Sequence, residues 1–264
     1  MPRVAPLFVA LALAATAGLA AAQPAATPPP AAPPQRMEPH DPNEQADLAT
    51  VAAAGKALVT SGAGALTAFA PDLKRVLSHM PSPYSKSETH GDVVEYHADN
   101  AGDFLVFSAA AQKAGAGEIV WTPQPYSEAA FLLGFYYDDL GDFDDAIAAL
   151  NAGLIAEPNN AAILGERGAA FNGAKRFEEG LASYAAGLKA EGLDDRTKAR
   201  LLRGEGFALT ELRRLDEAEQ AYQTSLSLDP GNALAQNELK YIAGLKAGAN
   251  ATPGSIIKAK PPTT

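Results

Sequence analysis

A self-similarity with a period of about 34 residues constrains the fold of this chain more than any other feature of its sequence. Shifting the sequence by one period places Gly134 on Gly168, and a second, slightly longer shift places Gly168 on Gly206. A unit of this length can hold two amphipathic helices, but it cannot bury its apolar face alone. Neighbouring units must therefore stack into one continuous core, and the sequence predicts an array of helical repeats.

The repeated residues resemble the tetratricopeptide repeat (TPR) family. The first unit carries the family's Leu133-Gly134 pair followed by the aromatic Tyr137, and it closes on Pro158, which cannot donate to a continuing helix. The resemblance covers about residues 127–246. It implies first helices over residues 127–140, 161–174 and 197–212, and second helices over residues 143–156, 177–190 and 216–228.

The later units depart from the family pattern at several positions. Arg167 and Glu205 stand where the first unit has leucine, and Gly192 stands in place of a closing proline. Four extra residues lie between the second and third units. Because four residues make about one helical turn, we expect a longer loop or a longer helix there.

The segment before the repeats has a different pattern. Apolar residues trace helical faces over residues 48–59 and 73–77. Residues 93–97, 104–107 and 119–121 read as strands, and the turn-rich segment 99–103 would join the first two. We expect a small α+β unit that packs on the front of the array and caps it.

The composition of the chain and the spacing of its apolar residues divide it into distinct segments. The expected fold class is mainly α: a three-repeat TPR helical solenoid with a C-terminal capping helix, preceded by a small α+β N-terminal unit. The expected segments are a signal peptide (1–22), a Pro/Ala-rich linker (23–43), the α+β unit (44–122), three repeats (127–160, 161–194 and 199–232), a capping helix (232–246) and a disordered tail (247–264).

The first 22 residues are typical of a secretory signal peptide. Arg3 precedes a short apolar run, and the small side chains of residues 20–22 suit cleavage before Gln23. A retained membrane anchor is the alternative, against which Pro6 and the high alanine content argue. The chain has no cysteine, which excludes a lipoprotein anchor, disulfides and thiolate metal sites. We expect a bacterial protein that is periplasmic or secreted.

Charge and hydropathy limit the partners. The net charge of −10 disfavours the phosphate backbone of nucleic acids, so we expect no nucleic-acid partner. No second apolar run reaches spanning length, so we expect no membrane span after cleavage.

Histidine and acidic residues that could ligate a metal cluster in one stretch of the sequence, residues 90–97. His90, Asp92, Glu95 and His97 are ligand types for zinc, but a solvated hairpin edge explains them more simply because no further ligand pair supports a site. Hydrolase signatures such as G-x-S-x-G and H-E-x-x-H do not occur. We expect a protein without cofactor or metal that is not an enzyme.

The resemblance implies a concave groove lined by the first helices, where partner proteins bind. Its acidic residues in the first repeat and basic residues in the third would orient a bound segment. Phe131 and Phe135 have an alternative role, which is packing against the α+β unit. The expected groove residues are Glu128, Phe131, Phe135, Asp138, Asp139, Ala169, Asn172, Arg200, Arg203, Phe207 and Thr210.

Three functions are compatible with these features. The first is a periplasmic adaptor that binds a segment of another envelope protein in the groove. The second is an enzyme or ligand-binding protein with its site in residues 44–122, and the third is a structural subunit of an envelope complex. Binding that survives on residues 127–246 would favour the first over the second, and a stable monomer would count against the third.

The signal peptide yields a first prediction. The chain purified from a bacterial periplasm should begin at Gln23, because the residue pattern before it suits signal peptidase. N-terminal sequencing measures this directly. A chain that begins at Met1 and sediments with the membranes would contradict it.

Overall fold

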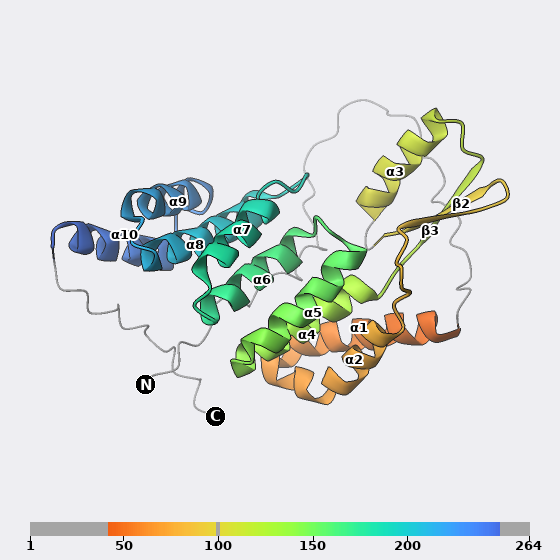
Figure 1. The fold of residues 1–264 in the computed structure, drawn as a ribbon, viewed down its shortest axis with the longest axis horizontal. Coiled ribbons are helices and arrows are strands. Elements are labelled where there is room, and N and C mark those ends of the chain that lie inside the picture. The colour runs from red at the N-terminus through yellow and green to blue at the C-terminus, as the bar shows by residue number, and fades with distance from the viewer. Residues whose placement is uncertain (1–41, 99–100, 249–264) are drawn as a thin grey trace, which may run out of the picture. The chain divides into compact units, whose positions relative to one another are not determined.

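The computed structural model describes residues 42–98 and 101–248 (Figure 1). The predicted signal peptide, nearly all of the predicted linker and most of the predicted tail therefore lie outside the described residues. The chain forms two compact units. The N-terminal unit comprises described residues of 42–140 together with 148–158, and the C-terminal unit comprises 141–147 together with 159–248.

The predicted fold class is confirmed, since the chain is mainly α-helical with a small sheet before the helical repeats. Among the described residues, no helix has both the length and the apolar character needed to cross a bilayer.

Four helical segments form one part of the N-terminal unit. They are α1 (Pro42–Ser61), the 3₁₀ helix η1 (Ala63–Ala68), α2 (Ala70–Ser78) and α4 (Tyr126–Leu140). Helix α4, the first helix of the first repeat, packs on α2, η1 and α1. Leu66, Leu73 and Val76 are fully buried in this unit. The N-terminal helices therefore bury one face of the first repeat helix.

A buried polar pair links α1 to the end of α2. His79 Nδ1 lies 2.6 Å from Asp47 Oδ2, and the Asp47 side chain is only 2% exposed. A carboxylate this deeply buried needs a hydrogen-bond partner, and His79 supplies it.

The other part of the N-terminal unit is a three-stranded sheet in the order β1-β2-β3, formed by β1 (Ser87–His90), β2 (Val93–His97) and β3 (Glu118–Thr122). Strands β1 and β2 form an antiparallel hairpin at Gly91, whose φ of 64° glycine adopts without strain. Strands β2 and β3 are parallel, with Tyr96 opposite Trp121. A parallel pair needs a crossover, and α3 (Ala101–Lys113) provides it.

The predicted strand over residues 104–107 is wrong, because these residues lie within α3. A run of four apolar residues fits a helix as well as a strand. The alanines that follow favour the helix, and the run then places Phe104 and Phe107 on the face toward the sheet. Phe107 stacks on Tyr96 at 3.9 Å between ring centroids, and Phe104 lies 6.0 Å from Trp121.

The repeat helices agree with the predicted ranges to within three residues at either end. Their bounds are α5 (Phe143–Ala156), α6 (Ala161–Gly173), α7 (Phe177–Gly187), α8 (Asp195–Glu211), α9 (Leu215–Leu228) and α10 (Ala233–Lys246). Helix α5 begins in the C-terminal unit and continues into the N-terminal one. Within the C-terminal unit, each helix from α6 to α10 packs on the next (Figure 1).

The aromatic ring of Tyr184 on α7 is tightly packed in the C-terminal unit, between glycines of two helices. A Cβ atom added at Gly168 of α6 would lie 2.6 Å from Tyr184 Cε1, and one added at Gly204 of α8 would lie closer still to Cζ. The ring therefore lies between two glycines from neighbouring repeats. The third repeat has the equivalent of the Gly168–Tyr184 contact, because a Cβ at Gly206 would lie 2.8 Å from the ring of Tyr222.

This packing predicts that Gly168→Ala destabilises the chain. Alanine favours a helix over glycine by about 1 kcal/mol, but the blocked Tyr184 ring cannot yield, so we expect a net loss of roughly 1–3 kcal/mol in unfolding free energy. Urea unfolding of the full chain measures the change.

Two variants control this experiment. Gly231→Ala meets open space and should leave stability nearly unchanged. In a Tyr184→Leu background, Gly168→Ala should cost much less, because the obstructing ring is gone. Equal effects of Gly168→Ala with and without the ring would contradict the proposed packing.

Candidate protein-binding surface

The predicted groove residues are divided between the two units. Glu128, Phe131, Phe135, Asp138 and Asp139 belong to the N-terminal unit, and Ala169, Asn172, Arg200, Arg203, Phe207 and Thr210 belong to the C-terminal unit. The charge gradient from the first repeat to the third therefore stays a prediction.

In the N-terminal unit, the aromatic residues of α4 are buried. Phe131 is 9% exposed and Phe135 is 2% exposed, while Asp138 is 3% exposed. Glu128 and Asp139 are exposed. Because α4 packs on α1, η1 and α2, the burial favours the alternative role for Phe131 and Phe135, which is packing against the N-terminal helices.

In the C-terminal unit, α6 and α8 pack against each other and are joined by a buried ion pair. Arg200 Nη1 donates to Glu166 Oε1 at 2.7 Å, and the Glu166 side chain is 2% exposed. The other oxygen, Oε2, has no hydrogen bond within the part of the chain that the structure describes. Arg200 therefore neutralises a carboxylate inside the protein as well as lying on the predicted groove face.

Arg203 is also engaged within the protein. Its Nη1 donates to Asp229 Oδ2 at 3.1 Å and to Ser225 Oγ at 3.2 Å, and its side chain is 12% exposed. Burial lowers the pKa of the Arg203 guanidinium, although the Asp229 carboxylate opposes that shift. Arg203 thus ties α8 to the end of α9, and little of its charge remains for a partner.

Asn172 bridges the second repeat to the third. Its Nδ2 donates to the Tyr184 hydroxyl at 3.2 Å and to the Gly204 carbonyl at 3.2 Å. Thr210 is buried and donates to the carbonyl of Gly206, one turn earlier in its own helix, at 2.8 Å. The polar groups of this face are therefore engaged within the protein, and two of them, Asn172 and Arg200, link the second repeat to the third.

On this face, the aromatic side chain of Phe207 is partly exposed to solvent. It is half-buried, and its ring centroid lies 6.4 Å from that of Phe177 in an edge-on arrangement. Ala169 of α6 is also half-buried. Ala169 and Phe207 are thus partly exposed apolar residues on the first helices of successive repeats.

The structure does not arrange the four residues considered for zinc as a set of metal ligands. His90 Nε2 lies 3.4 Å from Glu88 Oε2 and 4.0 Å from Glu95 Oε2, and Glu95 Oε1 accepts a hydrogen bond from Thr122. Across residues 42–98 and 101–248, no group of three or more histidine or acidic residues is arranged to hold a metal ion.

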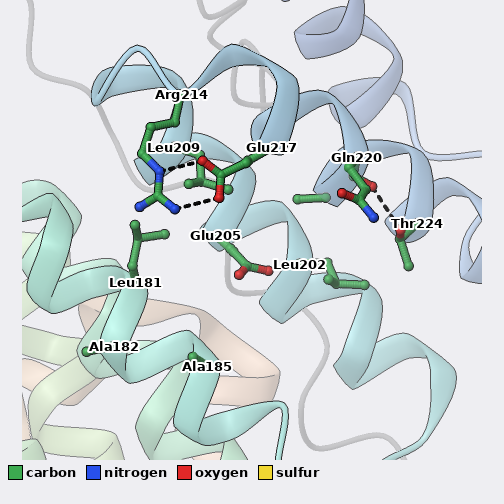
Figure 2. Close-up of a pocket in the computed structure, with 11 residues that line it drawn as sticks. Leu181, Ala182, Ala185, Leu202, Glu205, Leu209, Arg214, Glu217, Gln220 and Thr224 are labelled. Atoms are coloured by element: carbon green, nitrogen blue, oxygen red, sulfur yellow. Dashed lines mark hydrogen bonds and ion pairs between the residues drawn. The ribbon is translucent and has the colours of Figure 1, made fainter.

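Sequence reasoning missed a cleft on a different face of the C-terminal unit, between α7, α8 and α9 (Figure 2). The sequence feature that could have indicated this cleft is Glu205, a carboxylate at a position where the first repeat has leucine.

The Arg200–Glu166 pair yields a stability prediction. Arg200→Met leaves the buried Glu166 carboxylate without its cation and should lower the unfolding free energy by roughly 2–4 kcal/mol. Adding Glu166→Met should restore most of that loss, because an apolar pair can replace a buried ion pair.

The matched control is Arg176→Met, which breaks an ion pair with Glu179 whose side chains are 42% and 49% exposed. Exposed pairs contribute at most about 1 kcal/mol. Chemical unfolding of the four chains measures the differences. An Arg200→Met loss no larger than that of Arg176→Met would contradict a structural role for the buried pair.

Comparison with known proteins agrees with the repeat geometry. The tetratricopeptide repeat family model matches residues 127–160 and 205–232. The RNA polymerase II-associated protein 3 of Mus musculus is 30% identical over 130 residues, which are 48% of this chain and 19% of that protein. The chain thus spans less than a fifth of that relative's length.

Two solved domains of the human protein RPAP3 are also similar. Its first TPR domain is 26% identical, with a TM-score of 0.44, over 47% of this chain and 94% of that one. Its second TPR domain, solved with the HSP70 peptide SGPTIEEVD, is 28% identical, with a TM-score of 0.39, over 42% of this chain and 88% of that one. From the family model and the repeated helix pairs, the chain contains tetratricopeptide repeats.

Proposed function

We propose that this chain is a protein-interaction scaffold, and that the face formed by α6 and α8 binds a segment of a partner protein. The observation that carries the proposal is Phe207, a half-buried ring on a face whose polar side chains are otherwise paired with one another. Aromatic side chains at such positions commonly supply most of the binding energy of an interface.

The internal pairing also favours binding by keeping the face rigid. Asn172 and Arg200 each connect the second repeat to the third, so neither has to be ordered when a partner arrives. A receptor that is already ordered loses less conformational entropy on binding.

These ion pairs also limit the charge that we expect on the partner segment. Arg200 and Arg203 already face Glu166 and Asp229, so a strongly acidic partner segment gains little from them. We therefore propose a segment that offers an apolar side chain to Phe207 and Ala169. Its backbone can accept hydrogen bonds from the guanidinium N–H groups of Arg200 that Glu166 does not use.

We place this activity in the bacterial envelope, with another envelope protein as the partner. The support is the pattern of residues 1–22, and the N-terminal sequencing described above tests it.

Two variants of the same helix test the binding face. Phe207→Ala and Leu202→Ala each truncate a large, half-buried apolar side chain of α8, on different faces of the helix. The full-length chains are used as bait, and recovered proteins are quantified by mass spectrometry. We expect Phe207→Ala to reduce recovery of the partner about tenfold, which corresponds to about 1.4 kcal/mol, and Leu202→Ala to leave it unchanged.

Both variants should keep the same helical circular dichroism, so that a binding loss cannot be attributed to unfolding. A partner that is recovered equally by the wild-type and Phe207→Ala chains does not bind at this face. A partner that is lost only with Leu202→Ala binds on the side of α8 that Leu202 occupies.

A further inference from the structure

A cleft of about 440 Å³ lies between α7, α8 and α9, entirely within the C-terminal unit (Figure 2). This volume is within the range of about 300–1,000 Å³ that is usual for ligand sites. The cleft is lined by Leu181, Ala182, Ala185, Leu202, Glu205, Leu209, Arg214, Glu217, Gln220, Ala221 and Thr224.

The cleft uses a different face of α8 from the proposed binding surface. Leu202, Glu205 and Leu209 recur at intervals of three and four residues and so share one side of the helix. At 100° per residue, Phe207 lies far around the helix from that side. Occupation of the cleft therefore leaves the Phe207 face open.

The cleft is mainly apolar, and one of its carboxylates, that of Glu205, accepts no hydrogen bond from any described residue. Leucine and alanine side chains supply most of its lining. Arg214 donates to both oxygens of Glu217, at 2.7 and 2.5 Å, as Figure 2 shows. Glu205 has no hydrogen bond or ion pair within the described residues, and burial raises the pKa of its carboxyl group, although the Arg214 charge opposes that shift. A ligand that brings a cation next to an aliphatic side chain would satisfy both features.

One segment of this chain has that chemistry and begins close by. The end of α10 is fixed beside α9 by Lys246, whose Nζ lies 2.5 Å from both Asp216 Oδ1 and Glu219 Oε2. These two residues are next to the cleft residues Glu217 and Gln220. The nine residues from 249 to 257 can span about 30 Å when extended, whereas a helix is about 10 Å wide.

The sequence beyond α10 complements the cleft. Residues 249–264 lie outside the described part of the chain, but their composition is known: they contain two lysines, Lys258 and Lys260, and no acidic residue. Ile256 and Ile257 are their only large apolar residues, and they directly precede Lys258. The first turns of α9 are acidic, with Asp216, Glu217 and Glu219.

We propose that the cleft between α7, α8 and α9 binds residues 256–260 of the same chain, with isoleucine among the cleft leucines and Lys258 paired with Glu205. This interaction holds the C-terminal segment on a face separate from that proposed for the partner. It is independent of the proposed function, because neither Phe207 nor Arg200 takes part.

Disulfide trapping tests the proposal, because the chain has no cysteine of its own. The full chain receives Ile257→Cys together with Ala182→Cys, an exposed residue of the cleft. The control combines Ile257→Cys with Ala243→Cys, an exposed residue of α10 that is much nearer in sequence. We expect the intramolecular disulfide to form about tenfold faster in the Ala182 pair, since binding raises the effective concentration of the two thiols.

A further variant tests the charge pair. Lys258→Gln in the Ala182 pair should slow trapping about threefold, because it removes the cation that faces Glu205. Non-reducing electrophoresis with mass spectrometry measures the rates. Equal or faster trapping in the Ala243 pair would overturn the proposal. Disulfide-linked dimers from the Ala182 pair would also overturn it, since they would put the segment of a second copy in the cleft.

Discussion

The C-terminal unit depends on the ring of Tyr184, which is held between glycines of two different repeats. The ring extends from α7 toward Gly168 of its own repeat and Gly204 of the next, and at neither position is there room for a β-carbon. One side chain thereby sets the spacing of three helices. Its hydroxyl accepts a hydrogen bond from Asn172, so the contact that fixes the spacing also orients a polar group of the proposed binding face. Because cores at this packing density resist a single added methyl group, the repeats have little freedom to slide past one another.

The charged residues of that face have a structural role first. Glu166 is nearly inaccessible, and a buried carboxylate without a cation would be costly, so Arg200 is required at the position one repeat later. Arg203 similarly compensates Asp229 at the turn into α10. Removing these residues would disturb the array and its surface together. Substitutions of them are therefore poor probes of binding, whereas Phe207 can be truncated without exposing a buried charge.

Local sequence signals predicted the repeat helices, and contacts between distant residues account for what they missed. Glycine and proline at fixed positions delimited α4 to α9 to within three residues. The helix over residues 104–107 was missed because four apolar residues do not determine the period, and the parallel pairing of β2 with β3 is a contact across more than twenty residues. The packing of α4, which carries Phe131 and Phe135, on α1, η1 and α2 is likewise a set of contacts between distant parts of the sequence. The Glu166–Arg200 ion pair is a long-range contact that the sequence could have predicted, because the two residues of opposite charge lie one repeat period apart.

The departures from the repeat pattern explain why α8 has two faces of unlike chemistry. Four extra residues precede α8, and it has 17 residues where α6 has 13. Small side chains at Ala182, Ala185 and Ala221 leave space between the second helices of the two repeats, and Glu205 brings a carboxylate into that space where leucine would have filled it. A half-buried carboxylate that accepts no hydrogen bond reduces stability, and a cation that binds there recovers part of the loss. In the two proposals, the same helix presents a mainly apolar, internally neutralised face to a partner and a mainly apolar cleft with one carboxylate to a basic segment, so that one repeat takes part in two independent interactions.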